Sequence, residues 1–294
     1  MRNSRLHRFW PAVFRRLGLA RRLNYDHPLT ISGRAFSIPI AGGIGEDLLK
    51  LTPDFKSEII RLFGDRIPNC FVDVGANLGQ TVIEAFATRR WDRYFAVEPN
   101  PTACAYLESL VKANHLPVDV LPWGAGADAS PHSFCFQGTT DASATMAPEE
   151  RPGAYSPEMS RSVATYPLDV LLDIFPLPPG LMIKIDVEGF EAEVLAGARN
   201  ILSDVRPVIL CEVLRAYEPA SLTFTEKRMS KLEAILAAVD YRIFYLELEN
   251  EVSGRILSMK EIASFPRALW RESPSGMDYL FVPAEMTLPD FLAG

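Results

Sequence analysis

Short apolar runs alternate with segments of helical periodicity from about residue 55 onward, and this alternation constrains the fold more than any other feature of the chain. The apolar runs predict strands at 70–74, 93–98, 117–122, 181–186 and 207–213. The periodic segments predict helices near 54–64, 79–89, 101–114, 190–202 and 226–239. The pattern is typical of an α/β domain with a mostly parallel sheet and helices on both faces. Two later runs, 242–248 and 278–282, are expected to add an antiparallel pair of strands at one edge.

The overall composition disfavours several other classes of protein. With 294 residues, of which 48% are hydrophobic, the chain is long enough for one large α/β domain with a well-buried core. The 30 basic residues are outnumbered by 37 acidic ones, and the net charge of −7 disfavours binding to nucleic acid. The four cysteines form no C-x-x-C pair, which argues against a zinc site or a dense disulfide framework and favours a reducing compartment, the cytoplasm. No uninterrupted run of about 18 apolar residues is present, so no transmembrane helix is predicted.

The N-terminal segment differs from the rest of the chain in its charge. Residues 1–25 contain seven arginines and no acidic residue, which leaves the remaining domain, residues 26–294, with a net charge of −14. Pro11 must begin or kink any helix in this segment, but its apolar residues recur at the spacing of one helical face: Leu6, Phe9, Trp10, Val13, Phe14 and Leu17. We predict a basic amphipathic arm that either makes peripheral contact with an anionic membrane or is partly disordered and docks on its own domain. An organelle transit peptide is a third interpretation, whereas a secretory signal is disfavoured.

Residues 124–166 break the alternation of strands and helices. This stretch is rich in Ala, Ser, Pro and Gly and is longer than an ordinary connection, so we expect an insertion that forms a pocket or lid, or else a surface excursion. Its polar run at 139–145 offers hydrogen-bonding groups for a hydroxylated substrate, although a plain loop would have a similar composition. The histidines show no metal-binding spacing and are expected at the surface or at helix caps: His7, His27, His115 and His132.

The clearest motif is an apolar strand that runs into a glycine turn and then a helix, FVDVGANLGQ at residues 71–80. Gly75 lets the backbone approach a ligand, and Gly79 lets the following helix pack closely. The spacing is G-x-x-x-G, so the G-x-G-x-x-G fingerprint of dinucleotide-binding proteins is absent. Asp73 suits a ligand with a nearby positive charge, and Glu98, at the end of the next strand, is placed to accept hydrogen bonds from ribose hydroxyls. Together these acids favour an adenosine-containing ligand over the alternative that each is a solvated loop carboxylate or a helix cap.

A second group of charged residues follows the fourth predicted strand. Asp186 and Glu188 come where this strand ends, so they are expected in the same crevice as the glycine turn. Lys184 lies inside the apolar run and is costly to bury unless a carboxylate pairs with it, and Glu212 ends the fifth strand at the same rim. The group is either catalytic or a structural ion-pair network. A divalent metal held by Asp186 and Glu212 is the less favoured alternative, and no metal is predicted.

Three blocks in order, VDVGANLG, FAVEPNP and IKIDVEGFEAEVLAGA, followed by PVILCEV, resemble the FkbM family of S-adenosylmethionine-dependent methyltransferases. The similarity covers roughly residues 55–250 and implies a Rossmann-like class I methyltransferase fold, with seven strands of which the last is antiparallel, and S-adenosylmethionine as cofactor. The resemblance also implies which residues contact the cofactor. The methionine and ribose part is lined by Asp73, Gly75, Asn77 and Gly79, the ribose hydroxyls are bound by Glu98, and the adenine lies near Asn100. Gly126, in the turn at 124–128, is a looser match for a further adenine contact.

The resulting expectation is an O-methyltransferase that positions an acceptor hydroxyl in line with the sulfonium methyl group. A carboxylate removes the acceptor proton, and we predict Asp186 as this base, with Glu188 as the second choice and Glu212 as the third. The family resemblance implies a sugar, glycan or polyketide-like hydroxyl as acceptor. Two alternatives are a nicotinamide-dependent oxidoreductase and a catalytically inactive binding or scaffold protein.

Overall fold

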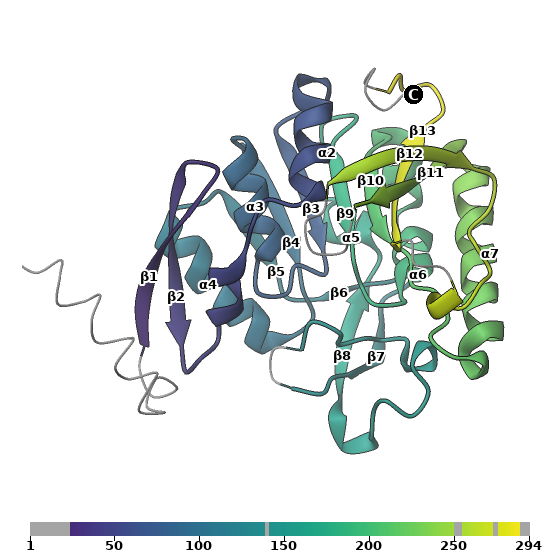
Figure 1. Cartoon of the computed structure of the whole chain (residues 1–294), viewed down its shortest axis with the longest axis horizontal. Helices are drawn as coiled ribbons and strands as arrows, with labels where there is room; N and C mark the ends of the chain where they lie inside the picture. Colours follow the sequence, from purple (N-terminus) through teal and green to yellow (C-terminus); the bar gives the residue numbers. More distant parts are fainter. Residues whose placement is uncertain (1–23, 139–140, 250–254, 273–275, 289–294) are drawn as a thin grey trace, which may run out of the picture.

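The computed structural model describes residues 24–138, 141–249, 255–272 and 276–288 (Figure 1). The predicted N-terminal arm, residues 1–25, lies outside the described residues except for Asn24 and Tyr25, which begin strand β1. None of the described helices is both long and apolar enough to cross a membrane.

A central sheet of eight strands organises the domain in the order β12-β11-β13-β10-β9-β3-β4-β5 (Figure 1). Its parallel part consists of β3 (Cys70–Val74), β4 (Arg93–Val97), β5 (Val118–Leu121), β9 (Met182–Ile185) and β10 (Val208–Glu212). From β3 the chain adds β4 and β5 on one side and later β9 and β10 on the other. The strand order therefore reverses between β3 and β9, and ligands of open α/β sheets bind at the carboxyl ends of the strands beside such a reversal.

The antiparallel part of the sheet corrects one prediction. Strands β11 (Tyr241–Leu248) and β13 (Asp278–Pro283) pair antiparallel, as expected, but β13 lies between β10 and β11 instead of at the edge. The edge is formed by β12 (Ile256–Ile262), which brings the sheet to eight strands where the family resemblance implies seven. Only Ile256 and Met259 of β12 are buried, so its sequence carries little of the apolar alternation that identifies a strand.

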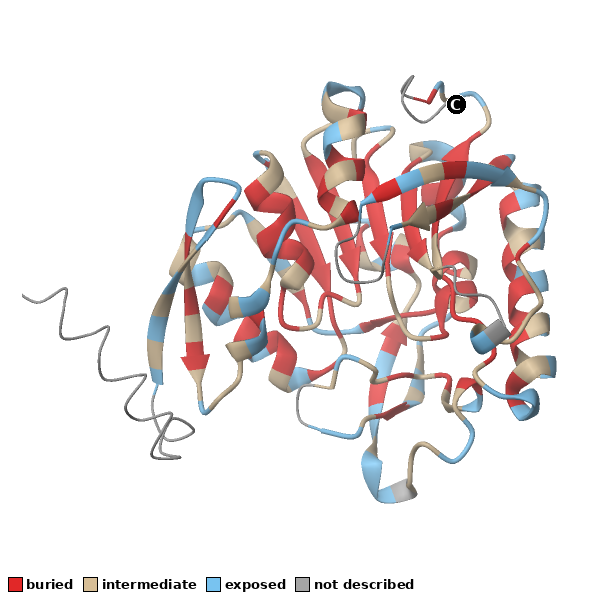
Figure 2. Cartoon of the chain, viewed as in Figure 1, coloured by how far each residue is buried: buried red, intermediate tan, exposed pale blue. Residues whose placement is uncertain are grey.

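Helices cover both faces of the sheet, as predicted, and each face has its own apolar core (Figure 2). One core is formed with α2 (Phe55–Phe63), α3 (Gln80–Thr88) and α4 (Pro101–Asn114), and the other with α5 (Leu168–Leu171), α6 (Glu191–Ala196) and α7 (Leu222–Ala238). The helix predicted at 190–202 is broken: α6 ends at Gly197, and a π-helical turn follows at Ile201–Val205. A Cβ on Gly197 would lie 1.9 Å from the carbonyl oxygen of Gly126, so the break occurs where the insertion packs against the chain.

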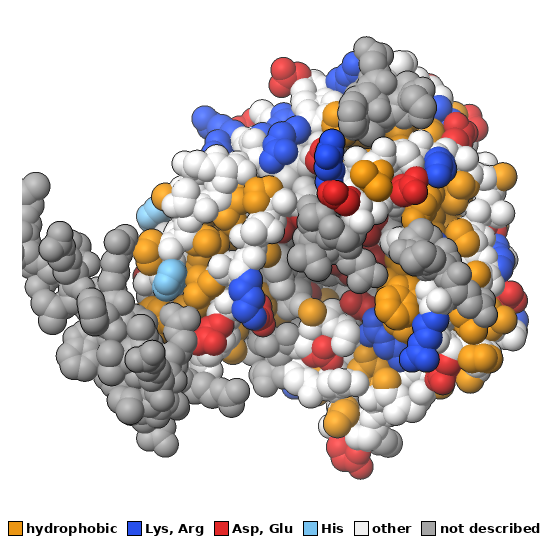
Figure 3. Space-filling model, viewed as in Figure 1, with side chains coloured by type: hydrophobic (Ala, Val, Ile, Leu, Met, Phe, Trp, Pro, Cys, Tyr) orange, Lys and Arg blue, Asp and Glu red, His pale blue; other side chains and the backbone are white. Residues whose placement is uncertain are grey.

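Two further sheets flank the central one. The hairpin of β1 (Asn24–Ile31) and β2 (Arg34–Ala41), which the sequence analysis missed, packs against α4, where the Tyr106 hydroxyl donates to the Pro39 carbonyl at 2.8 Å. The insertion at 124–166 forms a three-stranded sheet from β6 (Gly124–Ala125), β8 (Ser160–Tyr166) and β7 (Ser130–Cys135), beside the carboxyl ends of the central strands (Figure 1). On the face shown in Figure 3, acidic, basic and hydrophobic side chains are interspersed.

Candidate active site

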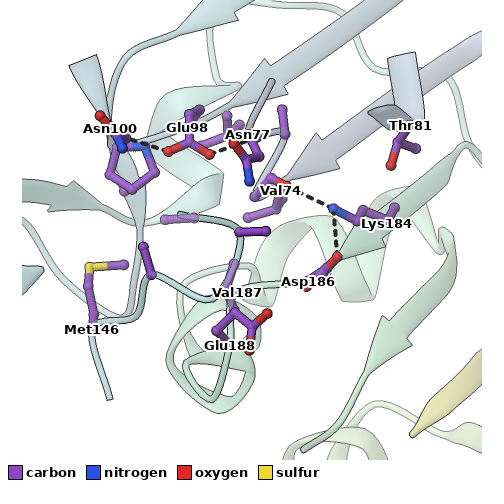
Figure 4. Close-up of a pocket in the computed structure, with 18 of the residues that line it drawn as sticks. Val74, Asn77, Thr81, Glu98, Asn100, Met146, Lys184, Asp186, Val187 and Glu188 are labelled. Carbon is purple, nitrogen blue, oxygen red and sulfur yellow. Dashed lines mark hydrogen bonds and ion pairs between the residues drawn. The ribbon is translucent and has the colours of Figure 1, made fainter. Parts of the chain in front are cut away.

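A cavity of about 240 Å³ lies where the carboxyl ends of β3, β4 and β9 meet the insertion (Figure 4). The predicted site residues that line it are Gly75, Asn77, Glu98, Asn100, Lys184, Asp186 and Glu188. The insertion contributes Asp141, Ala142 and Ala144 from the polar run, together with Phe134 and Met146. The described residues that line the cavity do not include four of the predicted ones, Asp73, Gly79, Gly126 and Glu212.

The glycine turn owes its tight geometry to the neighbouring strand. Gly75 has a φ of +81°, and a Cβ at this position would lie 1.8 Å from the carbonyl oxygen of Asp186. The backbone N–H of Asp186 in turn donates to the Val74 carbonyl at 3.1 Å. Gly79, with a φ of +88°, packs instead on α4, since a Cβ there would meet Leu107 at 2.7 Å. The close packing predicted for Gly79 is thus present, and its contact with the cofactor stays a prediction.

Asp73 is a predicted cofactor contact that is not among the described residues lining the cavity. This side chain is fully buried, accepts a hydrogen bond from the Tyr94 hydroxyl at 2.9 Å and lies 3.2 Å from the Lys184 ammonium. The residues of a strand alternate between its two faces, and this position points between the sheet and its helices, away from the cavity. Asp73 is thus a structural partner of Lys184.

Glu98 holds the end of β4 and the glycine turn together. Its two carboxylate oxygens accept the backbone N–H groups of Asn77 and Asn100, each at 2.8 Å. Burial raises the pKa of Glu98 to about 7, although the two N–H donors favour its charged form. The side chain of Asn100 caps α4 by accepting the Thr102 N–H at 3.0 Å. Both residues line the cavity, and their contacts with the ribose and adenine of the cofactor stay predictions.

The beginning of α3 is a part of the site that the sequence analysis did not identify. Gln80 and Thr81 line the cavity, and among the described residues no side chain caps this helix and its first turn holds no acid. The first N–H groups of a helix have no partner within it, so they can bind an anion. Lys56 of α2 also lines the cavity and forms ion pairs with Asp54 and with the buried Glu84 of α3. Thr81 directly follows the glycine turn, which was the available sequence signal.

The structure pairs Lys184 with Asp186. The buried ammonium lies 3.3 Å from Asp186 and donates to the Gly75 carbonyl at 2.8 Å (Figure 4). It also lies 3.2 Å from Asp73. Burial lowers the pKa of Lys184, but the two carboxylates outweigh it and raise the pKa above its usual range. Burial alone would raise the pKa of Asp186. Lys184 and a hydrogen bond with Glu212 outweigh this effect, so the pKa of Asp186 is lowered from its usual value. Asp186 is therefore a stable carboxylate at neutral pH, and the predicted pairing of Lys184 with neighbouring acids is confirmed.

Glu188 stands in a different environment. It has a φ of +55°, which is uncommon for a residue with a Cβ, and its carboxylate accepts from the Arg151 guanidinium of the insertion at 2.6 Å. Burial and the charge of Asp186 raise the pKa of Glu188 to about 7, although Arg151 opposes this. Glu188 can therefore gain and lose a proton near neutral pH. Arg151 is a further residue that the sequence analysis missed.

Glu212 and Gly126 lie behind the cavity wall. Burial and the charge of Asp186 raise the pKa of Glu212 well above its usual range. Gly126 donates its N–H to the Tyr166 carbonyl at 3.0 Å, and its neighbours Gly124 and Ala125 line the cavity instead. The adenine contact predicted for Gly126 stays a prediction.

Comparison with known proteins identifies the family of this chain. Residues 73–243 match the model of the Methyltransferase FkbM domain, and this match covers more than half of the chain. The chain belongs to the FkbM methyltransferase family. Its matched domain is a methyltransferase domain of the Rossmann-like class I type that uses S-adenosylmethionine.

One curated relative of this FkbM protein is the hexuronic acid methyltransferase AglP of Haloferax volcanii, which is 31% identical over 172 residues. The match covers 57% of this chain and 66% of AglP, so the chain spans slightly less than two thirds of its relative. Among solved structures, the FkbM methyltransferase of Methylobacillus flagellatus shares 18% identity at a TM-score of 0.45, with 78% of this chain and 48% of that chain covered. An O-methyltransferase from Bacillus cereus in complex with SAH shares 14% identity at a TM-score of 0.42, with 77% of each chain covered.

The cavity of this FkbM protein fits the cofactor of its family. Gly75 lines the cavity with its backbone alone, and Glu98 offers carboxylate oxygens for hydroxyl groups. At the other end, the N-terminus of α3 and Lys56 offer N–H donors and a positive charge for a carboxylate. A ligand with a ribose in the middle and an amino acid at one end matches this order of groups.

The three acids Asp186, Glu188 and Glu212 have carboxylate oxygens within 4.8 Å of one another. Lys184 pairs with Asp186 and Arg151 pairs with Glu188, while burial and the charge of Asp186 raise the pKa of Glu212. A divalent cation needs several charged oxygen ligands that are free to turn toward it. The cluster is thus explained by its protein partners, and we assign no metal to it.

Proposed function

We propose that this FkbM protein is an O-methyltransferase that transfers a methyl group from S-adenosylmethionine to a hydroxyl of a sugar or glycan, with a sugar acid as the first acceptor to test. The 31% identity to a hexuronic acid methyltransferase supports a sugar acceptor over a polyketide-like one. The observation that carries the proposal is the placement of Glu188: a carboxylate with a pKa of about 7 lines the cofactor cavity. Such a group suits removal of a hydroxyl proton at neutral pH.

S-adenosylmethionine supplies the methyl group on a sulfonium, which is a good leaving group. The protein residues therefore need to place the acceptor oxygen in line with the methyl group and to accept its proton. Asp186, which the sequence analysis favoured as the base, is tied to Lys184 and has a lowered pKa, so it is a weak proton acceptor. We assign the base to Glu188, and we propose that Asp186 holds the rim of the cavity and favours the positively charged sulfonium.

The test is a methyl-transfer assay with purified protein, S-adenosylmethionine and a panel of sugars, uronic acids and uronic-acid glycosides. We expect formation of S-adenosylhomocysteine together with a product that is heavier by one methylene group. A uronic acid offers both hydroxyl and carboxylate oxygens, so the product is then treated with mild alkali, which cleaves a methyl ester and leaves a methyl ether intact. A methyl ester, or no product from any sugar, would contradict the proposal. Binding of S-adenosylmethionine without any transfer would favour the inactive binding protein, whereas binding of NAD in its place would favour the oxidoreductase.

For residues 1–25 we propose peripheral contact with anionic membranes. Seven arginines and one apolar face support this proposal, because basic residues draw a segment to anionic lipid and apolar side chains then enter the interface. The test compares the full chain with a variant that begins at residue 24, in flotation with vesicles of phosphatidylcholine with or without phosphatidylserine. We expect the full chain alone to bind the anionic vesicles and salt to weaken this binding. If the two proteins float equally, residues 1–25 do not bind the membrane, and the alternative that they dock on their own domain is favoured.

A further inference from the structure

Arg151 and two aromatic residues form a continuous surface beside Glu188. The Arg151 guanidinium donates to Glu188 at 2.6 Å and to the Tyr217 hydroxyl at 3.2 Å, and it lies 4.9 Å from the centre of the Tyr217 ring. The Tyr217 ring is 5.9 Å from the ring of Trp270, whose backbone N–H donates to the Ala216 carbonyl. We call Arg151, Tyr217 and Trp270 the acceptor rim, since they adjoin the proposed base.

The structure holds Arg151 in place independently of Glu188. Its guanidinium also donates to the Ser143 carbonyl at 3.1 Å and to the Tyr155 hydroxyl at 3.4 Å. The preceding residue, Glu150, is 1% exposed and forms an ion pair with Arg228 of α7, which also pairs with Glu191 of α6. This buried triad fixes the insertion to both helices. Arg151 therefore keeps its position when the carboxylate beside it is exchanged for another.

The charges around the rim favour an acceptor with a carboxylate. Asp186 and Glu188 repel an anion that approaches the cavity, so an anionic acceptor needs a fixed positive charge next to the reacting hydroxyl. A guanidinium is suited to this role because its planar fork binds a carboxylate through two parallel hydrogen bonds. The half-buried rings of Tyr217 and Trp270 offer flat apolar surfaces for the apolar face of a sugar ring.

We propose that Arg151 is a specificity-determining residue that binds the carboxylate of a uronic-acid acceptor in exchange for Glu188, while Tyr217 and Trp270 contact the sugar ring. This inference rests on the proposed function and narrows its substrate class from sugars to sugar acids. The exchange also frees the Glu188 carboxylate to take the proton of the acceptor hydroxyl. An acceptor without a carboxylate leaves Glu188 bound to Arg151 and is methylated more slowly.

The experiment compares two acceptors that differ only in this group, 4-nitrophenyl β-D-glucuronide and 4-nitrophenyl β-D-glucoside. For the wild type we expect kcat/KM to be about 10- to 100-fold higher for the glucuronide. Arg151→Gln should remove most of this preference, because kcat/KM for the glucuronide should fall much further than kcat/KM for the glucoside when both are measured at a pH above the rise in kcat. Arg151→Lys keeps the positive charge but lacks the planar fork of the guanidinium, so its preference for the glucuronide should lie between that of the wild type and that of Arg151→Gln. The matched control is Arg161→Gln, because Arg161 also belongs to the insertion but stacks on Phe136.

A binding experiment separates this inference from the proposed function. The protein is first saturated with S-adenosylhomocysteine, and each glycoside is then titrated into this complex. If the wild type binds the glucuronide more tightly and Arg151→Gln loses that preference, the rim assignment stands even where no hydroxyl is methylated. Equal losses for both glycosides would overturn it, since Arg151 would then only position Glu188. Equal binding of the two glycosides by the wild type would overturn it as well. Melting temperatures of all variants show whether the fold is kept, and Tyr217→Phe replaces Arg151→Gln if that variant fails to fold.

Discussion

Gly75 lies directly against the backbone of Asp186, so close that a Cβ on the glycine would come within 1.8 Å of the Asp186 carbonyl oxygen. This contact joins the turn after β3 to the end of β9 at the point where the strand order reverses. The neighbouring strand by itself therefore requires a glycine at this position. The glycine turn after β3 and the acids after β9, Asp186 and Glu188, are thereby held at a fixed distance from each other.

We expect Gly75→Ala to disrupt both stability and cofactor binding. The added Cβ meets backbone instead of a flexible side chain, and the φ of +81° is unfavourable for alanine, so the free energy of unfolding should fall by at least about 2 kcal/mol. Chemical denaturation and titration with S-adenosylhomocysteine measure the two effects. Gly138→Ala is the control, because nothing lies within 4 Å of a Cβ at that position. Similar behaviour of the two variants would show that the β9 backbone yields to the added atom.

Asp73 and Glu98 should respond differently to substitution. Asp73→Ala removes one of the two carboxylates that pair with the buried Lys184 and the acceptor of the Tyr94 hydroxyl, and removal of one member of a buried ion pair typically costs about 3–5 kcal/mol of stability. Glu98→Ala should instead weaken the binding of S-adenosylhomocysteine by about tenfold or more, because charge-assisted hydrogen bonds to the ribose are lost. Melting curves and calorimetry distinguish the two outcomes. A stable Asp73→Ala protein with weak cofactor binding would restore the direct contact implied by the family resemblance.

The sequence was most informative where local patterns decide the structure. The helix at 101–114 matches α4 at both ends, because Asn100 supplies a cap and Pro101 a first residue that cannot continue a strand. The sequence was least informative where a residue acts through distant partners. Asp73 carries the family motif, yet the pleat of β3 turns it toward Lys184, and no sequence pattern places Arg151 beside Glu188, since the insertion carries no periodic signal.

Amide variants separate the roles of the two acids after β9. Glu188→Gln keeps the shape of the side chain but removes the proton acceptor, so kcat should fall by about 10² to 10⁴ with little change in cofactor affinity. Asp186→Asn removes a partner of the buried Lys184, so the melting temperature should fall together with activity. Rates and melting temperatures are measured for both. A larger loss of kcat in a stable Asp186→Asn protein would return the role of base to Asp186, and wild-type rates in both variants would direct attention to Glu212.

The rate should depend on pH through Glu188. Its pKa is raised to about 7, so the carboxyl group is protonated and inactive as a base below this value, and kcat should rise through about pH 7 to a plateau. Arg151 lowers this pKa, whereas burial and Asp186 raise it, and Glu191 adds a smaller effect in the same direction. Arg151→Gln should therefore shift the rise in kcat to higher pH. The measurement needs saturating cofactor, because the pKa of Glu98 is also raised to about 7. A pH-independent kcat from about pH 6 to 8 would exclude Glu188 as the base.

The N-terminus of α3 and Lys56 should recognise the carboxylate of the cofactor's amino-acid part. Thr81 is 5% exposed and lines the cavity, and both the helix N-terminus and Lys56 favour a negative charge there. Lys56→Met and Thr81→Val should each weaken the binding of S-adenosylhomocysteine by about tenfold. They should leave the binding of 5′-methylthioadenosine, which lacks the amino acid, within about twofold of the wild type. Lys50→Met is the matched control, because the Lys50 side chain is 79% exposed and pairs only with Asp47 among the described residues. Equal losses for both ligands in calorimetric titrations would mean that Lys56 and Thr81 support the glycine turn as a whole and make no specific contact with the carboxylate.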